Sequence, residues 1–365
     1  MAGGGADIPA ILAGLAPDIL IATMWVYALA LAYFYAAHHL SWRHGRAGWG
    51  VALGALPAIA LVLLRGQVGV DTPNYVSAVE VLRDVGDRVE MFEPLFEQIL
   101  LTLARLPLPP MGVLALVSVI TTLLLLRGWW RIERDMVLFT GIFAVYFFDM
   151  TMNGLRYGLA FAVITVAAAA LVRGRFVVFV VLVAAASLIQ ITSVLMGAVL
   201  LLCHEFRWRS VLVAGLLAAL VSLSFGDYLL LKVLANEILQ KPGALSGLST
   251  LALVGSLLAV WGTRPDLRAG AQGKIALLAS LALAAYAVAQ VSYAGLRLLS
   301  LLAFLTALVL ACHMHKRKLR FDRRTALVVI AIGILFGALK LRNMAQSDEE
   351  AEAPFVPYRF IWDER

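Results

Sequence analysis

Long apolar runs recur along the whole chain, and they constrain its fold more than any other feature. Each run covers about 15 to 23 residues, close to the roughly 20 that a helix needs to cross a membrane. The runs are continuously apolar instead of alternating, which argues against a transmembrane barrel. Only 15% of the 365 residues are charged, whereas a soluble domain carries about a quarter. The sequence therefore predicts an all-α, polytopic integral membrane protein with a single membrane domain over residues 1–365.

The apolar runs predict about 12 transmembrane helices. They cover residues 17–39, 49–64, 109–127, 136–149, 156–172, 176–190, 191–203, 210–225, 247–262, 274–293, 297–314 and 325–342. The pair 176–190 and 191–203 has no polar loop between its halves. A hairpin of two half-spanning helices therefore fits this stretch as well as two full crossings.

Basic residues alternate between the predicted loops. Every second loop is basic, and these loops hold more than half of the 30 Lys and Arg residues. The basic loops are 40–48, 127–135, 173–175, 204–209, 263–274 and 315–324. The positive-inside rule places them in the cytoplasm, together with all six histidines. The net charge of +7 then reflects topology, and it needs no nucleic-acid partner as an explanation.

The longest predicted outer segment, residues 65–108, carries several candidate site residues. Arg65 directly follows an apolar run, and Asp71 stands where an amphipathic helix begins, with Tyr75 in its first turns. Glu93 precedes a second helix start. Asp71 is either a plain helix cap or the first candidate for a general base, with Glu93 as the second candidate.

A second polar patch joins two apolar runs with no spare loop. It contains Asp149, Asn153 and Arg156, which the sequence places close to hydrocarbon depth. Ionisable residues at that depth are costly and are usually paired or functional. Arg156 opens a helix, so its guanidinium and the first free N–H groups favour a phosphate ligand. The alternative is an Asp149–Arg156 ion pair that only holds the turn.

The remaining outer candidates lie later in the chain: Gln190, Tyr293, Arg297 and Tyr358. Arginines from three separate helix ends would form the basic half of an anion site, and they suit a diphosphate better than a carboxylate. No histidine is predicted on this side. The outer face therefore excludes a histidine-based triad and a histidine-bound zinc, and we expect neither a metal nor a cofactor.

Together these residues resemble the EpsG-like branch of the Wzy-type polysaccharide polymerases. The matching motifs are Arg65 with Gly69-x-Asp71-x-x-x-Tyr75, Glu93-Pro94-x-Phe96, Asn153-x-x-Arg156, a late Arg297 and Pro357-Tyr358-x-Phe360. The strongest part of the resemblance covers roughly residues 65–200. The chain differs from the family pattern at Tyr157, where glutamine is usual, and at Gln190, where a histidine is usual.

The resemblance implies a metal-independent glycosyltransferase of the GT-C type in the bacterial inner membrane. Its donor would be a polyprenyl-diphosphate-linked oligosaccharide on the extracytoplasmic face, used for exopolysaccharide or O-antigen synthesis. A second lipid-linked glycan would be the acceptor, with membrane lipids and chain-length or export proteins as partners. Arg156 and Arg297, assisted by Arg65, would hold the diphosphate while Asp71 takes a proton.

Two other functions stay open from the sequence. A transporter or flippase of a lipid-linked or anionic substrate would also use broken helices. A structural membrane subunit with surface ion pairs is the third possibility. A polymerase would show its charged cluster in a cavity open to the outer face only, which separates it from a transporter.

Overall fold

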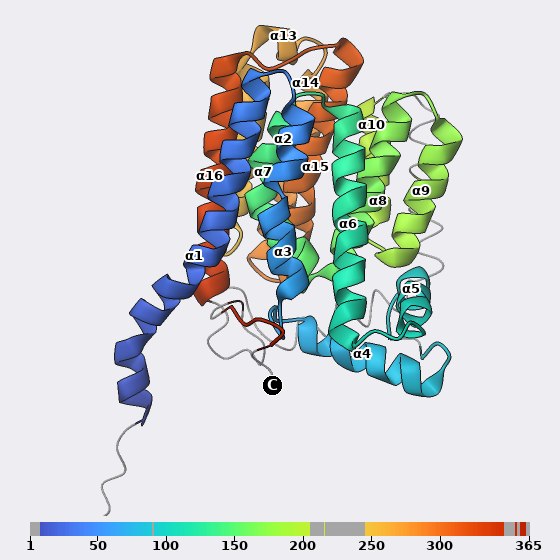
Figure 1. Ribbon diagram of the computed structural model, residues 1–365. Helices are drawn as coiled ribbons and strands as arrows, with labels where there is room; N and C mark the ends of the chain where they lie inside the picture. Colours follow the sequence, from blue (N-terminus) through green and yellow to red (C-terminus); the bar gives the residue numbers. More distant parts are fainter. Residues whose placement is uncertain are drawn as a thin grey trace, which may run out of the picture.

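The computed structural model describes residues 8–89, 91–204, 215, 245–346, 355 and 358–362, and Figure 1 shows them as a bundle of helices. No strand occurs among these residues, apart from an isolated antiparallel bridge between Arg65 and Phe360. The elements up to residue 153 are α1 (Ile8–Arg43), α2 (Ala47–Gly54), α3 (Leu56–Leu64), α4 (Thr72–Val85), α5 (Pro94–Ala104), α6 (Pro110–Ile132), α7 (Val137–Phe148) and the π-helix η1 (Asp149–Asn153). The later ones are α8 (Leu155–Val172), α9 (Phe176–Ile189), α10 (Ser193–His204), α12 (Leu248–Thr263), α13 (Pro265–Arg268), α14 (Gln272–Ala289), α15 (Tyr293–Arg317) and α16 (Arg323–Gln346).

The helices confirm an all-α, multi-pass membrane protein. Within the described ranges, 6 helices are long and apolar enough to cross a membrane, by length and composition. Further apolar helices, among them α9, α10 and α12, are shorter. The helices lie close to the predicted runs, but the number of twelve crossings and the GT-C fold stay predictions. The predicted crossing 210–225 lies outside the described residues.

The basic loops meet at one end of the bundle, which we call the basic end. His315 Nδ1 lies 2.7 Å from the carbonyl oxygen of Ile132, which links the loops after α15 and α6. Arg320 lies 3.9 Å from Asp135, and Arg264 pairs with Asp322. The alternation of basic loops along the sequence thus corresponds to a real sorting in space.

Three of the predicted crossings differ from one continuous, full-length helix: one is divided and two are short. The run 49–64 is divided into α2 and α3, because Pro57 lacks the N–H that would continue the helical hydrogen bonds, although the two together, Ala47–Leu64, count as one of the 6 candidate spans. Helices α9 and α10 have 14 and 12 residues. At 1.5 Å per residue each is about 20 Å long, shorter than the ~30 Å hydrocarbon core. The hairpin of two short helices therefore fits this stretch better than two full crossings.

The opposite end carries η1 and the short helices α4 and α5, and we call it the site end. Figure 1 shows α4 lying across this end of the bundle, beside α5. The buried face of α4 includes Val79 and Leu82, as its amphipathic pattern predicts. Arg83 ties α4 to the end of α5, since its guanidinium donates to the carbonyl oxygens of Ala104 and Leu108 at 3.0 and 2.8 Å.

Candidate active site

The π-helix η1 replaces the simple turn expected between two apolar helices. Gly154 N–H donates to Asp149 O at 2.8 Å, which closes the wider π turn. Ser118 of α6 donates to Thr151 O at 2.6 Å. The Thr72 hydroxyl shares its hydrogen between Val68 O at 2.8 Å and Met152 O at 3.1 Å. Hydroxyl groups of α6 and α4 thus donate hydrogen bonds to backbone carbonyl oxygens of η1. Short π-helices of this kind are frequent at functional sites.

The loop before α4 lies directly on η1. Gly69 has φ +108°, and a Cβ atom at this position would lie 2.4 Å from the carbonyl oxygen of Met152. Only glycine tolerates both the backbone conformation and the close approach. Gly69 therefore lets the loop approach η1 closely enough for the backbone of Asp71 to bond to Asn153.

A chain of polar contacts connects Asp71 to α16. The backbone N–H of Asp71 donates to Asn153 Oδ1 at 3.0 Å. The side-chain amide of Asn153 then donates to Asp149 Oδ1 at 3.2 Å. Asp149 Oδ2 forms an ion pair of 3.1 Å with Lys340 of α16. Both ends of the Asn153 amide are used in this chain, which fixes the position of Asp71 relative to η1.

The second part of the site joins α5 and α8. Arg156 Nη1 donates to Glu93 Oε2 at 2.6 Å, and Glu93 is buried. The guanidinium of Arg156 also lies over the ring of Phe92, 5.5 Å from its centroid. The ring centroids of Phe92 and Tyr75 of α4 are 5.7 Å apart. The ion pair and the ring hold Arg156 in one orientation at the first turn of α8.

Asp71 occupies the N-cap position of α4, yet its side chain forms no capping hydrogen bond. Its carboxylate is therefore not used as a plain cap. Burial raises the pKa of Asp71, and the charge of Asp149 acts in the same direction. The charges of Arg297 and Arg156 act to lower this pKa, so both guanidiniums are close enough to influence the carboxylate. A half-buried carboxylate near two cations is a suitable proton acceptor.

The structure brings most of the predicted residues to one place. Those that it joins by contact or by charge are Asp71, Tyr75, Glu93, Asp149, Asn153, Arg156 and Arg297. Among the described residues Arg297 forms no ion pair, so its charge acts on Asp71 without a carboxylate partner of its own. The alternative Asp149–Arg156 ion pair is wrong, because Lys340 and Glu93 take these partners instead.

Four predicted residues stand apart from these contacts. Arg65 and Tyr358 are buried together at the end of α3. Gln190 caps the end of α9, and its Oε1 is buried without a partner among the described residues. Tyr293 begins α15 and is 38% exposed. This helix thus starts one turn before Arg297, the residue at which the sequence predicts its start.

Three contributors to the site are not evident from the sequence. Lys340 stands among the charges near the outer C-terminal end, and nothing in the sequence links it to Asp149. Phe92 precedes the Glu93-Pro94 motif, and its aromatic character could have suggested a cation–π partner for Arg156. Thr72 looks like an ordinary first-turn residue, although its hydroxyl holds η1.

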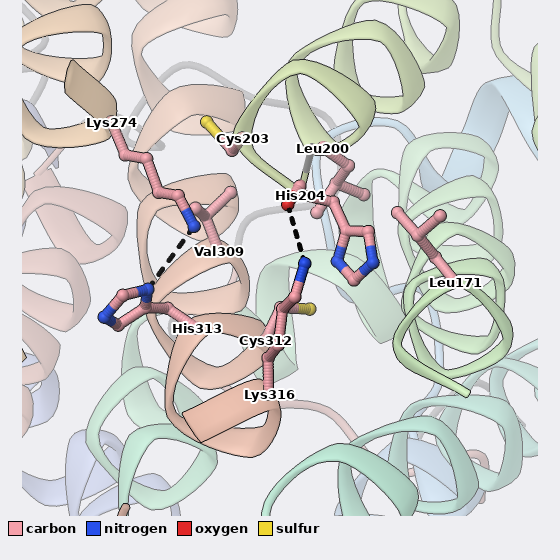
Figure 2. Close-up of a pocket in the computed structure, with 9 residues that line it drawn as sticks. All are labelled: Leu171, Leu200, Cys203, His204, Lys274, Val309, Cys312, His313 and Lys316. Carbon is pink, nitrogen blue, oxygen red and sulfur yellow. Dashed lines mark hydrogen bonds between the residues drawn. The ribbon is translucent and has the colours of Figure 1, made fainter. Parts of the chain in front are cut away.

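The cavity drawn in Figure 2 belongs to the basic end. It lies between the ends of α8, α10, α14 and α15, and it has room for about one water molecule. Lys274 and His313 hydrogen-bond at 3.3 Å, and Lys316 donates to His204 O at 3.3 Å. These contacts join helix ends. Within the described part of the chain, no group of three or more side chains could hold a metal ion.

A protein-family model covers most of this chain. Residues 53–360 match the model of the EpsG family, from α2 through the site end to Phe360. The chain belongs to the EpsG family. The matched range includes Asp71, Glu93, Arg156 and Arg297, so this EpsG-family protein carries its polar cluster within the family region. Membership supports a polysaccharide-polymerase type of function in the membrane. No curated protein and no solved structure matches this chain.

Proposed function

We propose that this EpsG-family protein is a glycosyltransferase that polymerises polyprenyl-diphosphate-linked oligosaccharides on the extracytoplasmic face of a bacterial inner membrane. One observation carries the proposal: Asp71 and Arg156 are both held at η1, Asp71 by its backbone hydrogen bond of 3.0 Å to Asn153 Oδ1 and Arg156, in the first turn of α8, by its 2.6 Å ion pair with Glu93. A carboxylate and two guanidiniums are the groups that displacement of a diphosphate by a sugar hydroxyl needs. The products would serve exopolysaccharide or O-antigen synthesis.

In the proposed reaction the acceptor hydroxyl oxygen attacks the anomeric carbon of the donor sugar. The bond from that carbon to the diphosphate oxygen breaks, and its electron pair goes to the diphosphate. The hydroxyl proton goes to Asp71. Arg156 and Arg297 stabilise the negative charge that grows on the leaving group, which is where preorganised cations lower the barrier.

The contacts refine the roles of three other residues. Glu93 positions Arg156 through their 2.6 Å ion pair, and it is therefore a weaker candidate for the base than Asp71. Asn153 positions Asp71 through the hydrogen bond from the Asp71 backbone. Tyr75 packs beside Phe92 and so lies next to the guanidinium of Arg156. The reaction as proposed uses no metal ion and no cofactor.

The predicted orientation of the protein in the membrane supports a lipid-linked donor. Nucleotide sugars are cytoplasmic, and the basic end is the predicted cytoplasmic side. A transferase with its site at the opposite end needs a donor that a lipid carries. Membrane lipids would surround the substrate, and a chain-length regulator or export proteins would be its protein partners.

The proposal is tested by incubating the purified full chain with lipid-linked repeat units and separating the products on a gel. A ladder supports polymerisation, a single added unit indicates a transferase that adds once and does not polymerise, and no product contradicts the proposal. A transporter or flippase would instead move labelled lipid across sealed proteoliposomes without lengthening it.

A further inference from the structure

A second cavity opens at the basic end, between the end of α6, the loop before α7 and the loop between α15 and α16. It shares no lining residue with the cavity of Figure 2, and we call it the interfacial cavity. Its volume of about 330 Å³ lies within the range of ligand pockets, roughly 300–1,000 Å³. The charged lining residues are Arg131, Arg134, Lys318, Arg320, Glu133 and Asp135. Four cations against two carboxylates leave a net charge of at least +2, so the lining favours an anion.

The two carboxylates of the interfacial cavity compensate little of this charge. Glu133 is buried, and both of its carboxylate oxygens accept hydrogen bonds from Leu138 N–H at the start of α7, at 2.9 and 3.0 Å. Burial also raises the pKa of Glu133 to about 7, so this group is only partly ionised at neutral pH. Asp135 lies 3.9 Å from Arg320. Within the described ranges the other three cations of the lining form no ion pair, and their charge is left for a ligand.

Lys318 occupies a backbone position that usually belongs to glycine. It directly follows the last residue of α15 and has φ +56°. Lys318 N–H donates to His315 O at 3.1 Å, and Leu319 N–H donates to Met314 O at 2.9 Å, which is the bonding pattern of a Schellman motif. A lysine in this conformation is strained, whereas a glycine is not. Residues held in such conformations cluster at ligand sites. The turn does not need this lysine, so its ammonium group points to a role in binding.

The cations of the interfacial cavity are held by segments far apart in the sequence. His315 Nδ1 lies 2.7 Å from Ile132 O, which joins the end of α15 to the end of α6. Arg173, in the turn between α8 and α9, donates to Arg131 O at 3.4 Å and brings a further cation next to the cavity. Contacts within the protein therefore hold the walls in place before a ligand arrives.

Exposed tryptophans indicate the depth of the interfacial cavity in the membrane. Trp130 lines the cavity and is 43% exposed. Its ring packs edge to face on Trp49, with centroids 5.6 Å apart, and Trp49 is 62% exposed. In multi-pass membrane proteins such tryptophans lie at the level of the lipid headgroups. Apolar side chains, among them Met314 and Phe321, complete the lining. The cavity thus combines cations with apolar surface at the depth where lipid phosphates lie.

We propose that the interfacial cavity binds an anionic phospholipid of the adjacent leaflet, with its phosphate on Arg131, Arg134 and Lys318. Basic pockets between transmembrane helices bind lipid headgroups in this way. Cardiolipin carries two phosphate groups and balances the net charge of the lining better than a lipid with one. Because the cavity lies at the basic end, the proposal does not depend on glycan transfer at the site end.

A lipid in the interfacial cavity would connect two helices that also reach the candidate active site. Helix α6 holds η1 through the hydrogen bond from Ser118 to Thr151 O. Helix α15 carries Arg297 near its other end. Bound lipid bridges the ends of α6 and α15 through the phosphate, and it should therefore stabilise the whole bundle against unfolding.

Native mass spectrometry of the purified full chain in detergent tests the proposal, with cardiolipin, phosphatidylglycerol and phosphatidylcholine titrated separately. We expect cardiolipin to bind most tightly. Arg131→Gln/Lys318→Gln should weaken it about tenfold, because each cation near a lipid phosphate contributes a several-fold factor. Arg323→Gln/Arg324→Gln is the matched control, since it removes the same charge from exposed positions of α16 that do not line the cavity. Equal losses in the two double variants overturn the proposal, as does cardiolipin binding no tighter than that of phosphatidylcholine.

Lys318→Gly separates binding from folding. Without added lipid this variant should unfold at a higher temperature than the wild type, because glycine adopts the positive φ without strain. The same variant should bind cardiolipin more weakly, since it lacks the ammonium group. Cardiolipin affinity equal to that of the wild type would overturn the proposal, because a variant that is folded and stable would then bind the lipid without this cation.

Two competitors distinguish a lipid from other anionic occupants. Inorganic diphosphate represents a soluble phosphate ligand, and poly-glutamate represents an acidic protein partner. We expect neither to displace cardiolipin at an equal concentration of negative charge, because neither has acyl chains for the apolar part of the lining. Displacement by diphosphate would assign the interfacial cavity to a soluble anion, and displacement by poly-glutamate would assign it to an acidic protein. Either result overturns the lipid assignment.

Discussion

Arg156 and Glu93 form a 2.6 Å ion pair that joins two helices across 63 positions of sequence. Glu93 is buried behind this contact, and Phe92 lies against the same guanidinium. The pair therefore orients one cation of the candidate site. The role of Glu93 is positional, and substitutions at the two partners should have different effects.

Replacing Glu93 by Gln should lower elongation by about tenfold to a hundredfold, because Arg156 loses the charge that fixes its orientation. Arg156→Lys should lower it further, since an ammonium cannot reproduce the planar fork. The rate of repeat-unit addition measures both effects. Glu97→Gln is the matched control, because Glu97 is also buried on α5 but lies 4.0 Å from Arg88 and accepts a hydrogen bond from Val89 N–H, instead of pairing with Arg156. Equal losses in Glu93→Gln and Glu97→Gln would mean that the ion pair has no specific role.

The pH dependence of the rate should report the ionisation of Asp71. Burial raises the pKa of its carboxyl, so the acid limb should lie above the usual aspartate value of about 4. A base must be ionised to accept a proton, and the rate therefore falls as pH falls through this raised pKa. The profile of initial rates against pH checks this. Asp71→Asn should leave a very low residual rate without that limb, and an unchanged limb in the variant would assign it to another group.

Gly69 should be required for the contact between the loop and η1. A methyl group there would meet Met152 O at 2.4 Å, in addition to a backbone strain of at least ~1–2 kcal/mol for a non-glycine residue. Gly69→Ala should lower both the unfolding temperature and the elongation rate. Gly86→Ala is the control, since Gly86 also has a positive φ but nothing lies within 4 Å of the position that a Cβ atom would take. Similar unfolding temperatures for the two variants would contradict the close approach.

Lys340 and Asp149 should couple α16 to η1. Their ion pair of 3.1 Å is partly shielded from solvent, with side chains 35% and 18% exposed. A double-mutant cycle with Lys340→Met and Asp149→Asn should give a coupling free energy of about 0.5–3 kcal/mol in detergent unfolding. Arg342→Met, which removes an exposed cation from the same helix, should show no coupling with Asp149→Asn. Additive effects of Lys340→Met and Asp149→Asn would show that the ion pair does not couple the two elements.

Hydropathy predicted the helices well, because the backbone N–H and C=O groups of a long apolar run in lipid must form their hydrogen bonds within a helix. The starts of α4 and α8 were also predictable, since Pro73 and the glycine before Leu155 mark them. The π-helix could not be predicted. Its carbonyl oxygens accept hydrogen bonds from the hydroxyl groups of Ser118 and Thr72, which lie in distant segments of the sequence.

The site was only partly predictable for the same reason. The sequence placed Asp71, Glu93 and Arg156 on one face, which their positions at helix starts determine. It could not choose between ion-pair partners, and the nearby Asp149 is not the partner of Arg156. Nor could it place Tyr358, because a residue near the end of the chain can return to any helix. The hydrogen bond from Tyr358 to Leu61 O shows that it returns to the end of α3.

Asp71 and Arg156 are the two residues on which glycan transfer at the site end depends most in the proposed reaction. The most direct measurement is the product ladder from purified wild-type protein, Asp71→Asn and Arg156→Ala, incubated with lipid-linked repeat units at equal folded concentration. We predict a ladder for the wild type and, over the same incubation time, no visible elongation beyond the starting unit for either variant. Ladders of normal length from both variants would contradict the proposed reaction.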